Sequence, residues 1–160
     1  MVAVVAVTGL VPACSRDSSD SPASPAATRA ATVIVRVGEA GPIQAEVADA
    51  RAERARGLMD RDQLPPGAGM VFVFPEPTTA SFYMFRTRIP LSIAFVDHDR
   101  VVSVAEMTPC PSDNADDCDL YPAGGPYTLA VEAPGRHFTD AGVRPGDPVR
   151  IDGDLPTAAD

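Results

Sequence analysis

Short runs of valine, isoleucine and phenylalanine recur along the chain from Thr32 onward, and turn-forming residues separate them. Runs of this length and spacing are typical of the strands of a sandwich or barrel. We therefore expect a mainly β fold, a small β-sandwich or jelly-roll-like barrel with one or two short helices. The pattern predicts strands over Thr32–Val37, Ile43–Ala48, Met70–Phe74, Ser81–Met84, Leu91–Asp97, Val101–Met107, Tyr127–Glu132 and Pro148–Ile151, with Pro75-Glu76-Pro77 among the turns.

Two segments depart from this pattern and predict short helices. Between Asp49 and Met59, Asp49 can cap a helix and Gly57 suits its left-handed exit. The second segment is Pro134–Ala141, which starts with proline and is followed by a glycine. In the first helix we expect the apolar side chains to pack on the sheet and the arginines to form a solvated face; the residues concerned are Ala52, Ala55 and Leu58, and Arg51, Arg54 and Arg56.

The first residues carry the pattern of an export signal. An apolar run from Met1 to Val11 leads into Pro12-Ala13-Cys14, which is close to the small-residue-then-cysteine site at which lipoprotein precursors are cut and lipidated. Pro12 is unusual there, and no basic residue precedes the run. The alternative is that residues 1–11 form a buried strand or helix of the domain. We interpret residues 1–14 as a signal peptide with its lipobox and Cys14 as the lipidation site.

The chain after Cys14 divides by composition. Residues 15–31 contain Ser, Pro, Ala and Asp but no large apolar side chain, so we expect a disordered linker. About 125 residues remain, the size of one domain. We expect a single β-rich domain over residues 32–153 and a flexible tail over residues 154–160. The predicted location is extracytoplasmic and lipid-anchored to the cell membrane, with simple secretion as the alternative.

Three cysteines support export, because assigning Cys14 to lipid leaves Cys110 and Cys118 as a pair that could oxidise outside the cytoplasm. A disulfide closing so short a loop stabilises a domain by roughly 2–3 kcal/mol, mainly by restricting the unfolded chain. Two thiolate ligands of a metal, or a redox pair, are the alternatives. We favour the structural disulfide, because the spacing is not CxxC and no histidine lies nearby.

The net charge of the chain limits the classes of partner that it can bind. The formal net charge is −9 and all 13 basic residues are arginine, which argues against nucleic-acid binding. Beyond Val11 no apolar run approaches the roughly 20 residues that span a bilayer. We therefore expect contact with a membrane only through the N-terminal lipid anchor, an unknown envelope ligand or protein as partner, and no cofactor.

Several motifs in order resemble the domain of unknown function 192 family over about residues 43–151. The matching elements are Arg56-Gly57-Leu58-Met59, Gly69-Met70-Val71-Phe72-Val73-Phe74 and Tyr121-Pro122-Ala123-Gly124. The resemblance implies a compact β-sandwich of jelly-roll type with a short helix, often exported, and no settled activity. In the family's F-W-M-K-N-T-x-I-P-L-D segment this chain has Phe85, Arg86 and Ser92 where Lys, Asn and Asp are expected.

Two sets of residues are candidates for chemistry. Glu106 and Glu132 end predicted strands, and two acids facing one cleft could perform general acid–base catalysis. The second set could bind an anionic or sugar-like group through guanidinium, hydroxyl and aromatic contacts. The candidate ligand-binding residues of this set are Arg86, Thr87, Arg88 and Tyr121. Solvent-facing glutamates and a polar turn with surface arginines are the ordinary alternatives.

We expect no metal site. The methionines are scattered and more typical of core packing than of copper binding. Asp113, Asp116, Asp117 and Asp119 crowd the loop between the cysteines, but they lack the Gly and distal Glu of an EF-hand.

The leading functional hypothesis is a tethered module that binds a ligand or envelope partner on the face made by the Arg86–Pro90 turn and the Cys110–Gly125 loop. An envelope hydrolase using the paired carboxylates is the first alternative, and a structural accessory protein without a ligand pocket is the second. Catalysis stays uncertain.

Overall fold

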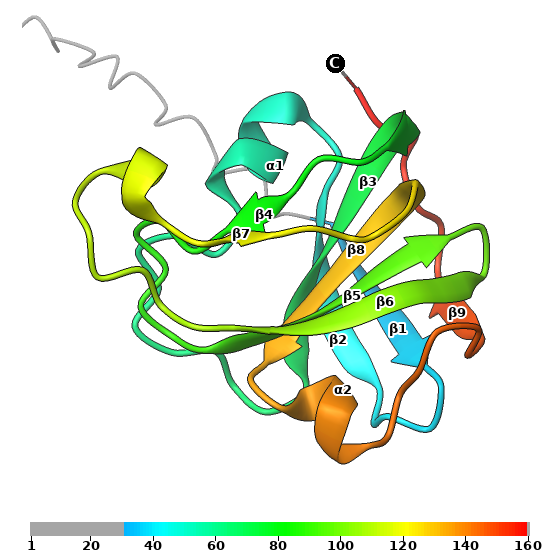
Figure 1. Cartoon of the computed structure of the whole chain (residues 1–160). Coiled ribbons are helices and arrows are strands. Elements are labelled where there is room, and N and C mark those ends of the chain that lie inside the picture. The colour runs from blue at the N-terminus through cyan, green and yellow to red at the C-terminus, as the bar shows by residue number, and fades with distance from the viewer. Residues whose placement is uncertain (1–30, 160) are drawn as a thin grey trace, which may run out of the picture.

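A sheet of seven strands curls into a half-barrel and forms most of the domain (Figure 1). The computed structural model describes residues 31–159. Cys14, the signal peptide and all but the last residue of the linker lie outside the described residues. In sheet order the strands are β6 (Arg100–Met107), β5 (Leu91–Asp97), β8 (Tyr127–Pro134), β3 (Ala68–Thr78), β2 (Ile43–Ala48), β1 (Thr32–Val37) and β9 (Val149–Asp152).

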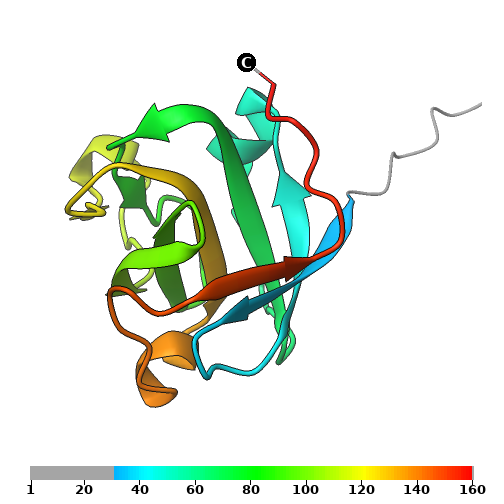
Figure 2. The same cartoon turned by 90° about the vertical axis from the view of Figure 1, so that its right-hand side faces the viewer.

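A ribbon of two short strands, β4 (Phe82–Tyr83) and β7 (Leu120–Tyr121), lies apart from this sheet. Helix α1 (Arg51–Arg56) connects the parallel strands β2 and β3, and α2 (His137–Asp140) follows β8. A single 3-10 turn, η1 (Ala115–Asp117), interrupts the loop before β7. Figures 1 and 2 show α1 and α2 at opposite ends of the half-barrel. The mainly β class with short helices is confirmed.

The central strands are buried on both faces, which divides the core into two clusters. One cluster contains Val35, Val71 and Val131, together with Phe138 of α2. The other contains Phe72, Ile93, Phe95 and Tyr127, whose rings and branched chains pack beneath α1 and the β4–β7 ribbon. Every residue from Leu91 to Val96 is therefore buried, as expected of a strand covered by structure on both sides.

Strand positions follow the apolar pattern closely, with β1, β2 and β5 occurring over the predicted residues. The prediction was wrong for β3, because the strand continues through Pro75-Glu76-Pro77 to Thr78 instead of turning. Proline has no N–H to donate to a ladder, and β3 pairs with β8 there only at Thr78 after a register shift. The two-residue strand β7 was not predicted.

The loop that contains η1 is closed by a disulfide between Cys110 and Cys118. The predicted pairing is confirmed. Asn114 caps η1 by accepting a hydrogen bond from the Asp116 N–H, and the Ser112 hydroxyl donates to Asp117 at 2.9 Å. The acidic loop is thus ordered by the covalent bridge and by its own polar side chains.

Helix α1 differs from its prediction at both its cap and its packing face. Its N-cap is Ala50, and the carboxylate of Glu53 accepts hydrogen bonds from the Ala50 and Asp49 N–H groups at 3.2 and 3.3 Å. The helix has no buried residue, so Ala52 and Ala55 do not pack on the sheet. Leu58, one turn further along, is buried.

Arg54 holds α1 on the sheet, so the expectation of a solvated arginine face was wrong for this residue. Its guanidinium donates to the carbonyl oxygens of Asp49, Val73 and Ala159, the last two at 3.0 Å. It also lies over the Phe74 ring, 5.5 Å from the centroid. One side chain therefore joins the helix, strand β3 and the C-terminal segment.

The C-terminal segment, expected to be a flexible tail, runs back along the domain toward α1 (Figure 2). Leu155 and Ala158 pack against the apolar core, and the Ala159 N–H donates to the Asp49 carbonyl at 2.9 Å.

We predict that Arg54→Met destabilises the domain by about 2–3 kcal/mol, because the hydrogen bonds of a charged donor to three carbonyls are lost while the apolar stem is kept. Denaturant unfolding of both variants measures this. Arg51→Met is the matched control, because Arg51 lies on the same helix, is exposed and has no resolved partner among the described residues. Equal stability of the two variants would contradict the role assigned to Arg54.

Candidate functional site

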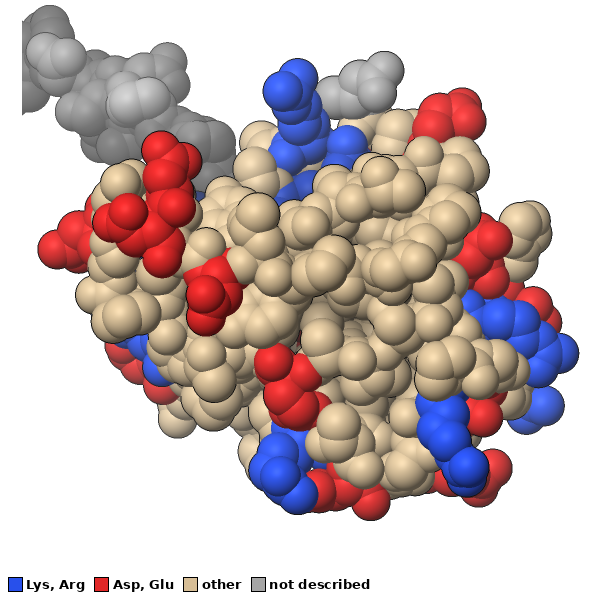
Figure 3. All heavy atoms as spheres, in the orientation of Figure 1, with Lys and Arg blue, Asp and Glu red and all other residues tan. Residues whose placement is uncertain are grey.

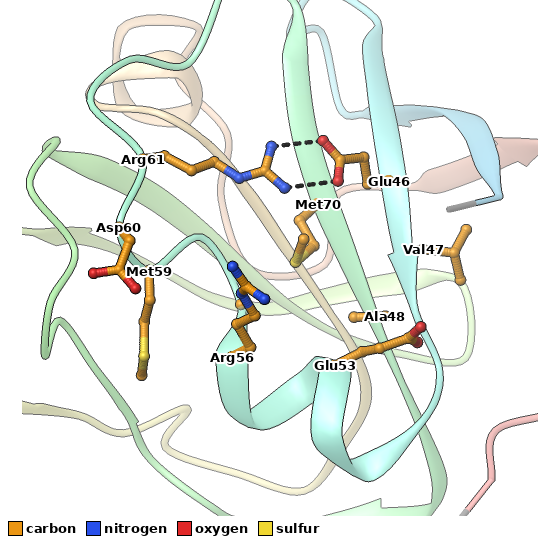
Figure 4. A pocket seen from close by; sticks show the side chains of 10 residues that line it. Glu46, Val47, Ala48, Glu53, Arg56, Met59, Asp60, Arg61 and Met70 are labelled. Carbon is orange, nitrogen blue, oxygen red and sulfur yellow. Dashed lines mark hydrogen bonds and ion pairs between the residues drawn. The ribbon is translucent and has the colours of Figure 1, made fainter. Parts of the chain in front are cut away.

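Two cavities lie on either side of the chain segment Arg56–Met59. The outer cavity has a volume of about 280 Å³ and lies between β2, α1 and the loop that follows it (Figure 4). The inner cavity has a volume of about 40 Å³ and lies beneath α1 and the β4 strand. Arg56, Gly57 and Met59 line both cavities. This segment carries one of the family motifs noted in the sequence.

Carboxylates of the outer cavity already have partners. Glu46 and Arg61 form a two-pronged ion pair, with oxygen–nitrogen distances of 2.6 and 2.7 Å (Figure 4). The hydrogen bonds from Arg61 lower the pKa of Glu46. Asp60 accepts from the Arg86 guanidinium at 3.0 Å, and the Glu53 carboxylate accepts the N–H groups at the start of α1. These groups shape the wall and leave little unsatisfied negative charge.

Arg56 is the charged residue of this wall that has no hydrogen bond or ion pair with any described residue. Arg56 is exposed at the end of α1, and its guanidinium points toward the outer cavity, which Met70 also lines (Figure 4). Guanidinium groups bind carboxylates and phosphates through parallel N–H donors. The outer cavity therefore has a cationic group available for an anion and thioether side chains, from Met59 and Met70, available for an apolar group.

Glu132 is the buried acid of the inner cavity. It lies on β8 opposite Met70 of β3 and Ile93 of β5, so its side chain enters the aromatic core cluster. Only 4% of the residue is exposed, and burial raises the pKa of its carboxyl to about 8. The carboxyl is therefore mostly protonated at neutral pH. It forms no hydrogen bond with the described residues, and because none of their fully buried side-chain oxygens or nitrogens lacks a partner, its oxygens keep some surface toward the cavity.

Gly69 brings the backbone of β3 against that of β8 at this point. A Cβ atom at residue 69 would overlap the Glu132 carbonyl oxygen and the Ile43 side chain. Only glycine allows such close approach of two backbones. The position of Glu132 is thus set by strand pairing on both sides.

The two candidate catalytic acids do not face each other. Glu106 is opposite Ser92, whereas Glu132 is opposite Ile93, the next residue of β5. Adjacent residues of a strand point to opposite faces, so the two carboxyls lie on opposite sides of the sheet. Glu106 accepts from the Ser92 hydroxyl at 2.7 Å and the Arg136 N–H at 2.7 Å, beside the start of α2. Its contacts are those of a structural residue.

The candidate binding residues separate in a similar way. Arg86 and Arg88 are exposed and paired with Asp60 and Asp62. The Tyr121 hydroxyl accepts the Thr108 N–H at 3.0 Å, and this side chain lines a different groove, beside the disulfide loop. Thr87 is 6% exposed and lines the inner cavity with Glu132.

Thr87 and Glu132, chosen for different reasons in the sequence, therefore belong to one cavity. Sequence reasoning missed Arg56 as a lining residue; its place in a family motif was the available signal. Within residues 31–159, no three His, Cys, Asp or Glu side chains are arranged to hold a metal ion. None of the described helices is long and apolar enough to cross a membrane.

Comparisons with known proteins identify relatives without assigning a function. The model of the DUF192 family, described as "Uncharacterized ACR", matches residues 33–151. No curated protein matches the chain. A crystal structure of a protein of unknown function from Novosphingobium aromaticivorans DSM 12444 is 35% identical, with a TM-score of 0.67, over 82% of this chain and 94% of that one.

A second crystal structure, from Sinorhizobium meliloti 1021, is described as a candidate transcription regulator. It is 23% identical with a TM-score of 0.67, over 76% of this chain and 95% of that one. At this identity the match shows the fold alone.

We predict that Glu132 makes the domain less stable as pH rises. Its pKa rises from 4.5 to about 8 on folding, so the stability present below pH 4.5 is lost progressively up to about pH 8. The slope from this one group is about 1.4 kcal/mol per pH unit. Denaturant unfolding at several pH values, compared with Glu132→Gln, isolates it. Parallel pH profiles for the two proteins would contradict a buried, protonated Glu132.

Proposed function

Since the chain belongs to the DUF192 family of uncharacterized proteins, we propose a function from the geometry of the domain. We propose that it is a ligand-binding module at the cell envelope, tethered outside the cytoplasmic membrane through Cys14. Its ligand is a small molecule with an anionic group, which binds in the outer cavity. The observation that carries this proposal is Arg56, a guanidinium without a resolved partner in a cavity of about 280 Å³.

The shape and lining of the outer cavity support a small ligand. Binding sites for small molecules are concave and largely apolar, with a few placed polar groups that orient the ligand. Here Ala48, Met59 and Met70 supply apolar surface, and the Glu46–Arg61 pair fixes one wall. Methionine side chains adapt to irregular shapes. A molecule with a short apolar part beside its anionic group would satisfy this surface.

The cysteines support the extracytoplasmic location. Disulfides persist in oxidising compartments and are rare in the cytosol. The Cys110–Cys118 bridge fits a domain that is exported, and the apolar run before Cys14 supplies the signal for export. The linker of residues 15–31 then holds the domain away from the membrane surface.

A protein partner is the second candidate, and one surface feature favours it. Tyr83 and Leu120 are opposite each other on the β4–β7 ribbon and are 39% and 66% exposed. Acidic side chains gather beside them over the η1 loop (Figure 3). A basic partner with an apolar contact would suit this surface. The envelope hydrolase has less support, because its two carboxyls lie on opposite faces of the sheet.

We predict that small aryl or alkyl carboxylates and phosphates bind the domain and that Arg56→Gln weakens them by about 10- to 100-fold, the value of one charge-assisted contact. Ligand-observed NMR with matched anionic and neutral fragments measures this. Arg51→Gln is the control, because it removes the same charge from the same helix outside both cavities. Equal losses in the two variants, or binding of neutral fragments alone, would rule out Arg56 as the anion-binding group.

The tether makes a separate prediction. Expressed in a bacterium that processes lipoproteins, the full chain should fractionate with membranes, and its N-terminal peptide should begin at an acylated Cys14. In the Cys14→Ser variant the acylated form should be absent, and the protein should be either uncut or secreted. Mass spectrometry of the membrane extract checks both, and an unmodified Cys14 in membrane-bound protein would contradict lipidation.

A further inference from the structure

We propose that the inner cavity is a second subsite that takes an uncharged hydrogen-bonding group of carboxamide type, held between Glu132 and Thr87. This inference rests on the proposed ligand-binding function and adds the chemistry of a second group. The subsite adjoins the outer cavity, because Arg56, Gly57 and Met59 contribute to the walls of both.

The first support is a carboxyl that opens into the cavity without a protein partner. Buried polar groups nearly always have hydrogen-bond partners, and those that face a cavity instead call for a ligand or water. The Glu132 residue is only 4% exposed and lines the cavity. Its carboxyl forms no hydrogen bond with the described residues, and because none of their fully buried side-chain oxygens or nitrogens lacks a partner, its oxygens keep some surface toward the cavity. The cavity of about 40 Å³ has room for about three water-sized groups. A group of three heavy atoms, such as a carboxamide, therefore fits.

The second support is the charge of the walls. The charged or titratable side chains that line the inner cavity, besides Glu132, are Arg54, Arg56 and Tyr83. Arg54 is held by three carbonyl oxygens, the Arg56 guanidinium points toward the outer cavity, and burial raises the pKa of Glu132. A second ionised group beside this carboxyl would be costly to bury. The cavity therefore favours a neutral group.

The third support is complementarity of donors and acceptors. A protonated carboxyl offers one O–H donor and one carbonyl acceptor, and a primary carboxamide offers the matching acceptor and donor. The two groups can form a pair of hydrogen bonds. The Thr87 hydroxyl, which donates to the Phe85 carbonyl at 3.3 Å, retains lone pairs that can accept the second amide hydrogen. Apolar walls from Phe72 and Phe82 strengthen such bonds by excluding water.

Acetamide is the probe, because it carries the group alone. Thr87 lines the inner cavity and not the outer one, so its NMR signal reports on the proposed subsite. In titrations at pH 6, where Glu132 is protonated, acetamide should shift the Thr87 signal, whereas acetate, which the outer cavity can bind, should leave that signal unchanged. At pH 9.5 acetamide should bind about tenfold more weakly, because the ionised carboxylate no longer donates. Glu132→Gln should bind with no pH dependence, since its side-chain amide keeps a donor and an acceptor at every pH.

Two further variants keep the test decisive. Thr87→Val should weaken acetamide about fivefold while preserving side-chain shape, and Glu132→Leu should abolish its binding. Glu76→Gln is the matched control, because Glu76 is exposed on β3 away from both cavities and should change nothing.

The remaining outcomes separate failure of the inner subsite from failure of the proposed function. No acetamide binding, equal binding in Glu132→Leu, or an equal shift of the Thr87 signal by acetate would overturn the inner subsite, and Glu132 would then be satisfied by water alone. If anionic fragments still bind through Arg56 in that case, the proposed function stands without the subsite. If neither probe binds, both proposals are wrong.

Discussion

Strand β8 lies between β3 and β5, and its burial on both faces is the constraint from which the rest of the site follows. Its residues from Ala130 to Ala133 are all buried, so any side chain there must enter one of the two core clusters. Glu132 enters the aromatic cluster, and at Gly69 the β3 backbone lies directly against the Glu132 carbonyl of β8. A carboxyl is thereby fixed in apolar surroundings, which raises its pKa and leaves it able to donate a hydrogen bond at neutral pH.

Helix α1 completes the site by covering this face without contributing to the core. A helix with no buried residue has little hydrophobic contact to hold it, so its position depends on polar contacts and on Leu58. Arg54 supplies these contacts through carbonyls of β3 and the C-terminal segment. Because α1 is tied at Arg54, the next turn of chain is placed between the two cavities. Arg54 therefore stabilises both the position of α1 in the fold and the wall that the end of α1 contributes to the two cavities.

The sequence predicted most of the fold because β-branched and aromatic residues are concentrated in the strands, and β1, β2 and β5 needed no further information. The course of β3 through Pro75 and Pro77 could not be predicted from the sequence. Proline has no N–H to donate, and the strand tolerates these two residues because the ladder with β8 is interrupted between Val73 and Thr78. The role of Arg54 could not be predicted either, because two of its three carbonyl acceptors, Val73 and Ala159, lie far from it in the chain.

The candidate site was predicted only in part, for a reason visible in β8. Thr128, Ala130 and Glu132 alternate with Leu129, Val131 and Ala133, which is the pattern of a strand with one solvated face. That pattern predicts an exposed glutamate, and only the β4–β7 ribbon and α1, which cover this face, make it a buried one. Whether Glu106 shares its face depends on strand register, which alternation within one strand does not determine.

The fold alone gives no reason for a carboxyl at residue 132. An apolar side chain of similar size would fill the same space among Met70 and Ile93 and would avoid the cost of burying an acid. Marginal stability makes such a cost significant, since a domain of this size has only about 5–15 kcal/mol to spare. Buried acids with raised pKa values occur most often where a protein binds or transforms another molecule.

The same reasoning distinguishes Glu132 from Glu106, whose carboxylate already accepts hydrogen bonds from the Ser92 and Thr139 hydroxyls and the Arg136 N–H. Of the two acids, the one whose hydrogen-bonding capacity is left over is the one that faces a cavity.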